Sequence, residues 1–152
     1  MTRSSGPACR GVTLVEGAAV GSVVVLDAPL SLWGGMGPDS GVIIDRHHPQ
    51  YGVELAGRIL VMTEGRGSSS SSSVLAEAVR AGTAPAGIVL TDPDEIIVVG
   101  ALVAAELYGA TLPVVRLEET DYARLGTGEE VRVTARAGAA TVEWVTDLGD
   151  AG

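Results

Sequence analysis

The stretch Gly65-Arg66-Gly67-Ser68-Ser69-Ser70-Ser71-Ser72-Ser73 decides the fold, because a strand pattern precedes it and a helix pattern follows it directly. Residues 58–62 form a short apolar run that is typical of a buried strand. Residues 74–80 place Val74, Leu75, Ala78 and Val79 on one side of a helix. The order predicts a strand, a glycine-rich turn, a hydroxyl-lined loop and a helix N-terminus.

This arrangement suits the binding of an anion. A helix N-terminus exposes unpaired backbone N–H groups and the positive end of the helix dipole. Arg66 adds a planar, permanently charged guanidinium that can hold a carboxylate or a phosphate through two hydrogen bonds. The serine hydroxyls can cap the helix, bind a ligand or transfer a proton. A Walker phosphate loop is excluded because its lysine is missing, and the Rossmann glycine pattern is absent.

Six consecutive serines have a second interpretation, since runs of this composition often form flexible linkers. Two observations argue against a linker here. The run stands between a strand pattern and a helix pattern without any spacer, and it begins with Gly-Arg-Gly, in which an arginine would be unusual for a neutral tether.

The composition favours one globular domain over residues 1–152, with flexible ends at about 1–9 and 147–152. The net charge of −9 argues against nucleic-acid binding and against an anionic membrane surface. The single cysteine, Cys9, allows no internal disulfide. The longest apolar run, residues 96–105, is too short to span a bilayer, and no signal peptide is recognisable. We therefore expect a soluble cytoplasmic protein.

The first third of the chain is rich in strand patterns. Residues 10–16 and 22–26 read as strands, and the glycine- and alanine-rich residues 17–21 read as a turn between them. Residues 27–41 form a long irregular segment with four glycines, two prolines and Trp33. We expect Trp33 to fill the core, because tryptophan is mostly buried.

Within this segment Gly34 and Gly35 permit backbone conformations or close approaches that a side chain would forbid. Residues 42–45 read as another strand, which Asp45 ends. The adjacent His47 and His48 would point to opposite faces of a strand, and no third ligand stands at a telling spacing, so the pattern disfavours a metal site. A substrate contact from Asp45 or His48 is more plausible than a metal site, and an exposed loop is the plain alternative.

The second half predicts a strand over residues 86–90, a nearly all-apolar and well-buried helix over 96–108, and a strand over 112–117. With the central stretch, this order predicts parallel strands joined by helical crossovers. Residues 130–135 and 141–145 alternate and predict a β-hairpin. The fold class is therefore mixed α/β, with β-rich ends around a central strand–helix–strand–helix–strand portion.

Several motifs in the right order resemble the swivel domain, or small subunit, of the aconitase X family. They are Pro29-Leu30-Ser31-Leu32-Trp33-Gly34-Gly35, Ile43-Ile44-Asp45 with His48-Pro49, Gly65-Arg66-Gly67-Ser68 through Glu77, and Gly82-Thr83-Ala84-Pro85. Each motif is weak alone, but together they are specific, and the resemblance covers residues 11–117. It implies the swivelling β/β/α fold of aconitases.

The resemblance also implies a function at an interface. Family members pack on a large subunit that binds an iron–sulfur cluster or iron, so this chain would hold no metal and would be inactive alone. Ser68 matches the catalytic serine that acts as a base. Bacterial members dehydrate cis-3-hydroxy-L-proline and archaeal members dehydrate mevalonate 5-phosphate; the uninterrupted serine run is closer to the bacterial branch. The candidate substrate-binding residues are Arg66, Gly67, Ser69, Ser70, Gly34, Gly35, Asp45 and His48.

The chemistry of these residues agrees with that expectation. Dehydration of a hydroxy acid needs an anion clamp, a base and a Lewis acid for the departing hydroxyl group. The chain offers Arg66 as a clamp and Ser68 as a base, and a partner would supply the Lewis acid. Two other hypotheses stay open: a non-catalytic module that binds anions through the same loop, and a scaffold domain with a serine linker.

Overall fold

We describe the protein from a computed structural model, which describes residues 6–65 and 70–145. Its seven strands form a closed barrel in the order β1-β5-β4-β3-β2-β6-β7. The elements are β1 (Cys9–Val15), β2 (Gly17–Val25), α1 (Leu32–Gly35), β3 (Ile59–Val61), α2 (Ser70–Ala81), β4 (Gly87–Leu90), α3 (Glu95–Tyr108), β5 (Val114–Arg116), α4 (Glu119–Tyr122), β6 (Glu130–Arg136) and β7 (Ala139–Trp144).

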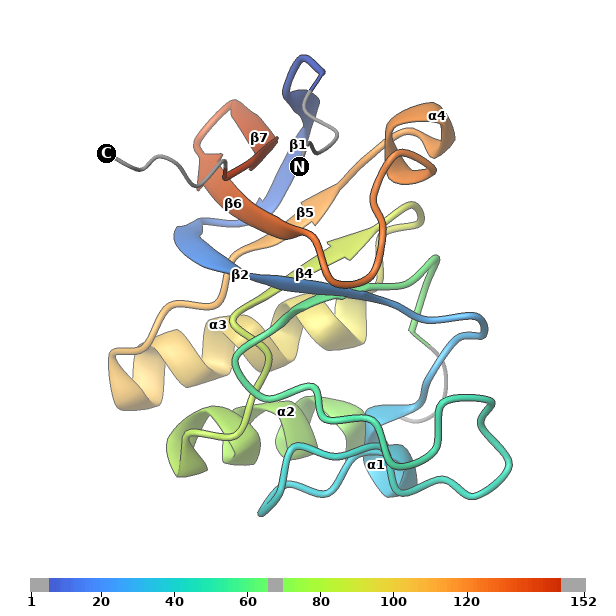
Figure 1. Ribbon diagram of the computed structural model, residues 1–152. Helices are drawn as coiled ribbons and strands as arrows, with labels where there is room; N and C mark the ends of the chain where they lie inside the picture. The colour runs from blue at the N-terminus through green and yellow to red at the C-terminus, as the bar shows by residue number, and fades with distance from the viewer. Residues whose placement is uncertain (1–5, 66–69, 146–152) are drawn as a thin grey trace.

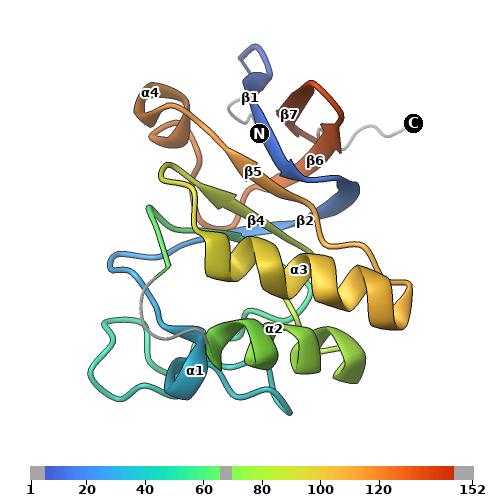
Figure 2. The same cartoon turned by 180° about the vertical axis from the view of Figure 1, so that it is seen from behind.

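The central part of the barrel is parallel. β3 pairs with β2 on one side and with β4 on the other, and β4 pairs with β5, all in parallel. The crossovers are α2 and α3, which run side by side along one side of the barrel (Figures 1 and 2). This part confirms the predicted strand–helix–strand–helix–strand order.

The two ends of the chain close the barrel. β1 pairs antiparallel with β5 and with β7, and the β6–β7 hairpin pairs with β2. The predicted hairpin is confirmed, and Gly138 supplies its turn with a φ of 92°. One apolar core lies between the barrel and the helices, and a second lies inside the barrel around Val133 and Val142.

Three predicted boundaries were wrong. The glycine- and alanine-rich residues 17–21 are not a turn but the first half of β2, because their pairing with β6 overrides their weak strand propensity. Residues 42–45 make only isolated bridges, Val42 to Glu54 and Ile43 to Met36, instead of a regular strand. The serine run is not all loop, since α2 already begins at Ser70.

The predicted burial was wrong at two places. Trp33 is 59% exposed instead of filling the core. Helix α3 turns only one side inward, formed by Ile97, Gly100, Ala101 and Ala104, while Leu102 is 50% and Leu107 is 64% exposed. Helix α3 is therefore apolar on every side but buried on only one, because only that side packs against the rest of the protein. No helix within the described ranges is long and apolar enough to cross a membrane.

Candidate functional site

The predicted loop stands at the edge of the barrel where the parallel strands end. Gly65 follows β3 and Ser70 opens α2, so both ends of the loop are placed. Arg66, Gly67, Ser68 and Ser69 lie outside the described residues. The groups that surround the two ends of this segment lie within the described residues.

Gly65 lies at a crowded point, where any larger residue would have to displace neighbouring side chains. It forms a parallel bridge with Leu30. A Cβ atom added to Gly65 would lie 2.6 Å from Oδ2 of Asp94 and 2.9 Å from Cδ1 of Ile97. Asp94 is held in place because it caps α3: its Oδ1 accepts hydrogen bonds from the backbone N–H groups of Ile96 and Ile97, at 2.9 and 3.2 Å. The start of the loop therefore packs directly against the N-terminus of α3.

Ser71 ties the other end of the loop to α1. Its side chain is buried, with 4% exposure, and its Oγ accepts a hydrogen bond from the backbone N–H of Trp33 at 3.1 Å. The Ser31 hydroxyl lies 3.5 Å from the same oxygen. One hydroxyl of the serine run thus fastens the glycine-containing turn Leu32–Gly35 to the first turn of α2, whereas Ser70 is exposed beside it.

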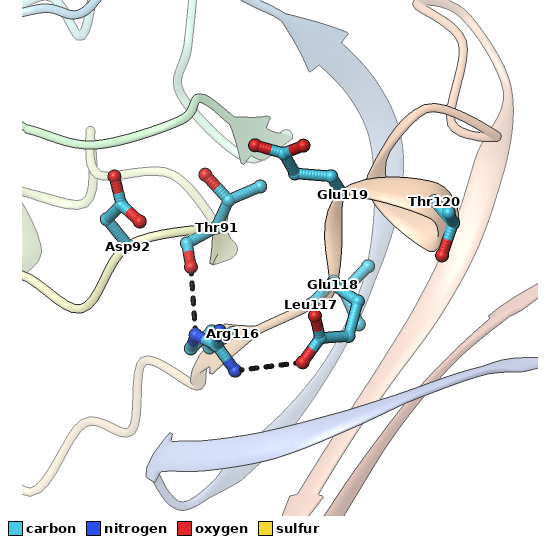
Figure 3. Close-up of a pocket in the computed structure, with 7 residues that line it drawn as sticks. All are labelled: Thr91, Asp92, Arg116, Leu117, Glu118, Glu119 and Thr120. Carbon is cyan, nitrogen blue, oxygen red and sulfur yellow. Dashed lines mark hydrogen bonds and ion pairs between the residues drawn. The ribbon is translucent and has the colours of Figure 1, made fainter.

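A polar pocket opens at the same edge, after β4 and β5 (Figure 3). Its volume is about 360 Å³, and it is lined by Thr91, Asp92, Arg116, Leu117, Glu118, Glu119 and Thr120. Figure 3 shows Arg116 joined to two neighbours: its Nε donates to the carbonyl oxygen of Thr91 at 2.9 Å, and its Nη1 lies 3.4 Å from a carboxylate oxygen of Glu118. The pocket lies at the carboxyl ends of two neighbouring parallel strands of the barrel.

The pocket and the loop are joined through Thr63, two residues before Gly65. The carbonyl oxygen of Thr63 accepts hydrogen bonds from the N–H groups of Thr91 and Asp92 and from the Thr91 hydroxyl, at 3.0 to 3.1 Å. Sequence reasoning missed Arg116 and this pocket. The available signal was a charged pair, Arg116 and Glu118, immediately after a buried strand.

The remaining predicted site residues lie on the segment around α1. Gly34 is exposed with a φ of 80°, which favours glycine, and Gly35 is buried where a Cβ would lie 2.8 Å from Cδ1 of Leu30. Both glycines thus have the conformational roles that their sequence suggested. Asp45 accepts a hydrogen bond from the N–H of His47 at 2.9 Å through Oδ1.

His48 has both ring nitrogens bonded to main-chain groups. Its Nδ1 accepts from the N–H of Gln50 at 3.0 Å, so Nε2 carries the proton and donates to the carbonyl oxygen of Ala28 at 3.0 Å. Gln50 completes the link, because its side chain accepts from the N–H of Asp27 and donates to the carbonyl of Val25, each at 2.8 Å. His48 and Gln50 therefore hold the segment that leads from β2 to α1.

The described residues do not fit an iron–sulfur or iron centre. Within residues 6–65 and 70–145, no three His, Cys, Asp or Glu side chains are grouped closely enough to hold a metal ion. The single cysteine, Cys9, is fully buried inside the barrel, and burial raises the pKa of its thiol. A buried neutral thiol is a poor metal ligand, because metals bind the thiolate.

A family model described as "Aconitase X swivel domain" matches residues 8–142. Among curated proteins, the chain is 50% identical over 107 residues to a cis-3-hydroxy-L-proline dehydratase of Pseudomonas aeruginosa, an alignment that covers 70% of this chain and 18% of that protein. It is also 37% identical over 142 residues to the cis-3-hydroxy-L-proline dehydratase of Hypocrea jecorina. This alignment covers 93% of this chain and 23% of that protein. The chain thus spans about a fifth of the length of these two relatives.

Shorter relatives match over most of their length. A phosphomevalonate dehydratase small subunit of Methanopyrus kandleri is 37% identical over 126 residues, which are 82% of this chain and 89% of that one. Among solved structures, the crystal structure of Thermococcus kodakaraensis aconitase X in its holo-form matches with a TM-score of 0.80 at 33% identity, and it covers 93% of this chain and 100% of that chain. The fold described above is therefore shared with that structure.

Proposed function

This chain belongs to the aconitase X swivel-domain family, and on that premise we propose that it is the small subunit of a hydro-lyase that dehydrates cis-3-hydroxy-L-proline. The observation that carries the proposal is the 50% identity over 107 residues to a protein named for that activity. Relatives named for the phosphomevalonate reaction reach 33% and 37% identity over 129 and 126 residues.

The role of the loop follows from the chemistry of the reaction. The α-proton leaves to a base, the bond from C3 to the hydroxyl oxygen breaks, and water and a pyrroline carboxylate result. We assign the base to Ser68 and the carboxylate clamp to Arg66, with Gly67, Ser69 and Ser70 beside them. A serine hydroxyl is a poor base at its ordinary acidity, so cationic and N–H donors must stabilise its alkoxide. Helix α2 begins at Ser70, and the positive end of its dipole supports this role.

The third requirement of the reaction is assigned to another polypeptide. We place the iron–sulfur cluster or iron on a large subunit, since the described residues of this chain do not fit such a centre. When bound, the metal supplies the Lewis acid that helps the hydroxyl group leave. Relatives that carry the name "small subunit" support the existence of such a partner.

Two alternatives have support of their own. The small subunits of phosphomevalonate dehydratase match this chain over 89% and 92% of their length, which favours mevalonate 5-phosphate as a second candidate substrate. An isolated anion-binding module is the other alternative, because a helix N-terminus and an arginine suit a carboxylate or phosphate without any catalysis.

Co-expression with a large aconitase X subunit from the same genome tests the proposal. The purified pair is expected to convert cis-3-hydroxy-L-proline to a pyrroline carboxylate, whereas this chain alone has no activity. Ser68→Ala is expected to lower kcat by about 100-fold or more, as loss of an acid–base group does. The matched control is Ser73→Ala, an exposed serine of the same run.

Each alternative has its own outcome. Formation of an anhydromevalonate phosphate, with no turnover of hydroxyproline, would replace the proposed substrate by the second candidate. Full activity of Ser68→Ala would remove the base assignment. Tight binding of phosphate by the isolated chain, with no dehydration by the pair, would favour the anion-binding module.

A further inference from the structure

We propose that an exposed apolar patch beside the site, formed by Trp33, Ile44 and Tyr51, is the surface by which this chain docks onto the metal-bearing large subunit. We call it the Trp33 patch. The proposal rests on the proposed function, because it identifies the partner of the same site. It adds a binding surface to residues that the reaction itself does not use.

The three side chains are large, apolar and exposed. Trp33 is 59%, Ile44 is 46% and Tyr51 is 53% exposed. Single exposed apolar residues are common, but these three stand on segments that are hydrogen-bonded to one another, and clustered exposed apolar residues mark interaction sites. Tryptophan and tyrosine are also the residues most enriched among those that dominate binding energy at protein interfaces.

Backbone hydrogen bonds hold the three segments of the patch together. The N–H of Ile44 donates to the carbonyl of Gly35 at 2.8 Å, and the N–H of Gly52 donates to the carbonyl of Ile43 at 2.8 Å. Ile43, which precedes Ile44, and Met36, which bridges Ile43, are buried in the core. The patch is therefore built in advance, and little ordering is needed when a partner binds.

The same segments hold both ends of the proposed catalytic loop. The backbone N–H of Trp33 binds the hydroxyl of Ser71 at the start of α2, and Leu30 bridges Gly65 at the other end of the loop. Figures 1 and 2 both show α1 beside the beginning of α2. A protein seated on the Trp33 patch therefore lies next to the loop, where a shared active site requires it.

The partner that binds the Trp33 patch is inferred from the lengths of the relatives. In the two cis-3-hydroxy-L-proline dehydratases, the matching part is 18% and 23% of a much longer chain, so about four fifths of each enzyme lies outside this fold. On the proposed function, that remainder carries the metal and meets the swivel domain at the loop. Another exposed apolar surface runs along α3, from Val99, which lines a hollow with Ser72 of α2, to Leu107 at the helix end that lies away from α1 (Figure 2).

The experiment titrates this chain into a fixed amount of large subunit and measures both calorimetric binding and hydroxyproline dehydration. Trp33→Ala is expected to raise the dissociation constant and the half-saturating concentration by about tenfold or more, as hot-spot residues do. The plateau activity at saturation is expected to stay unchanged. Leu107→Ala, an equally exposed apolar truncation on α3, is expected to leave both quantities within about twofold.

Several results would overturn the proposal: unchanged binding by both Trp33→Ala and Tyr51→Ala, a fall only in the plateau activity, or weakening by Leu107→Ala alone. Failure of the wild-type chain to bind the large subunit would overturn it too. Binding that depends on Trp33, in a pair that does not dehydrate hydroxyproline, would instead support the docking surface and refute the proposed substrate. An unchanged thermal midpoint of Trp33→Ala confirms that the variant is folded.

Discussion

His48 joins two loops through hydrogen bonds of its ring to main-chain groups. Because the ring has 7% exposure, removing it would leave the carbonyl of Ala28 and the N–H of Gln50 without their partner in a confined place. An unsatisfied buried polar group destabilises a protein by about 1 to 3 kcal/mol. His48 therefore fixes the path of the backbone from β2 to α1.

We predict that His48→Ala lowers the free energy of unfolding by about 1 to 3 kcal/mol, measured by urea denaturation. His48→Asn is expected to recover part of this loss, because its amide oxygen can replace Nδ1 as the acceptor for Gln50. His47→Ala, at the exposed neighbouring position, is the control. Equal midpoints for His48→Ala and His47→Ala would contradict the role of His48.

Cys9 gives a pH-dependent prediction. Burial raises the pKa of its thiol, a nearby Arg124 opposes this effect, and Asp121 adds to it. The folded state thus holds the proton more tightly than the unfolded state, so stability contributed by the neutral thiol is present below a pH of about 8.5 and is lost as the pH rises through the higher native pKa.

The measurement compares wild-type protein with Cys9→Ala in urea at several pH values. The stability advantage of the wild type is expected to shrink above a pH of about 8.5, since only the wild type titrates there. A thiol reagent is also expected to label Cys9 far more slowly in the native protein than in urea. Fast native labelling, or an advantage that does not change with pH, would show that the thiol is accessible.

At the scale of elements, α2 and α3 lie close together at Gly100. A Cβ atom there would lie 3.0 Å from the carbonyl oxygen of Ser72 and 3.2 Å from Cβ of Leu75. The first turn of α2, which adjoins the proposed catalytic loop, is thus positioned by a helix contact that only a very small residue permits.

Gly100→Val is predicted to push the two helices apart and to lower the free energy of unfolding by about 1 to 3 kcal/mol, as overpacking does. Because Ser72 belongs to the first turn of α2, kcat of the assembled enzyme should fall as well. The control is Leu102→Val, which places the same side chain on the exposed side of the same helix. The contact is unimportant if both variants unfold at the same urea concentration.

The elements that sequence reasoning predicted correctly are those whose signal is local. The strand–helix–strand–helix–strand order follows from short apolar runs, and the β6–β7 hairpin follows from two alternating segments. The errors have non-local causes. Residues 17–21 become a strand through pairing with β6, and Trp33 is exposed because α1 is a short turn at the edge of the molecule.

The candidate site was predicted in outline. The motif order located the loop between β3 and α2 and identified the family. The roles of Arg66 and Ser68 remain predictions, because both residues lie outside the described part of the chain. Arg116 and the pocket around it were missed, since only the folded sheet brings the ends of β4 and β5 together.

At the scale of the whole molecule, β1 closes the barrel by pairing with β5 and β7. No local pattern predicts this closure, because the partners of β1 are about 100 or more residues away in sequence. The closest approach is at Gly11, where a Cβ atom would lie 2.2 Å from the carbonyl oxygen of Arg116. A backbone atom so near leaves no space for any side chain.

Gly11→Val is therefore predicted to separate β1 from β5 and to lower stability by about 3 kcal/mol, with self-association through the exposed strand edges. Thermal unfolding and light scattering measure the two effects. Arg10→Val, at the adjacent exposed position of the same strand, is the control. A monomeric Gly11→Val protein with the wild-type melting temperature would show that the pairing of β1 with β5 does not require a glycine at position 11.

The pairing of the first strand with the last has a consequence for how the protein is made. During synthesis β1 emerges from the ribosome well before β7, which is one of its two neighbours in the barrel. One edge of β1 consequently stays unpaired until residues 139–144 have been made, so the barrel closes only after all the strands between them have emerged. A ribosome that stalls before residue 139 leaves a barrel that lacks β7 and cannot close.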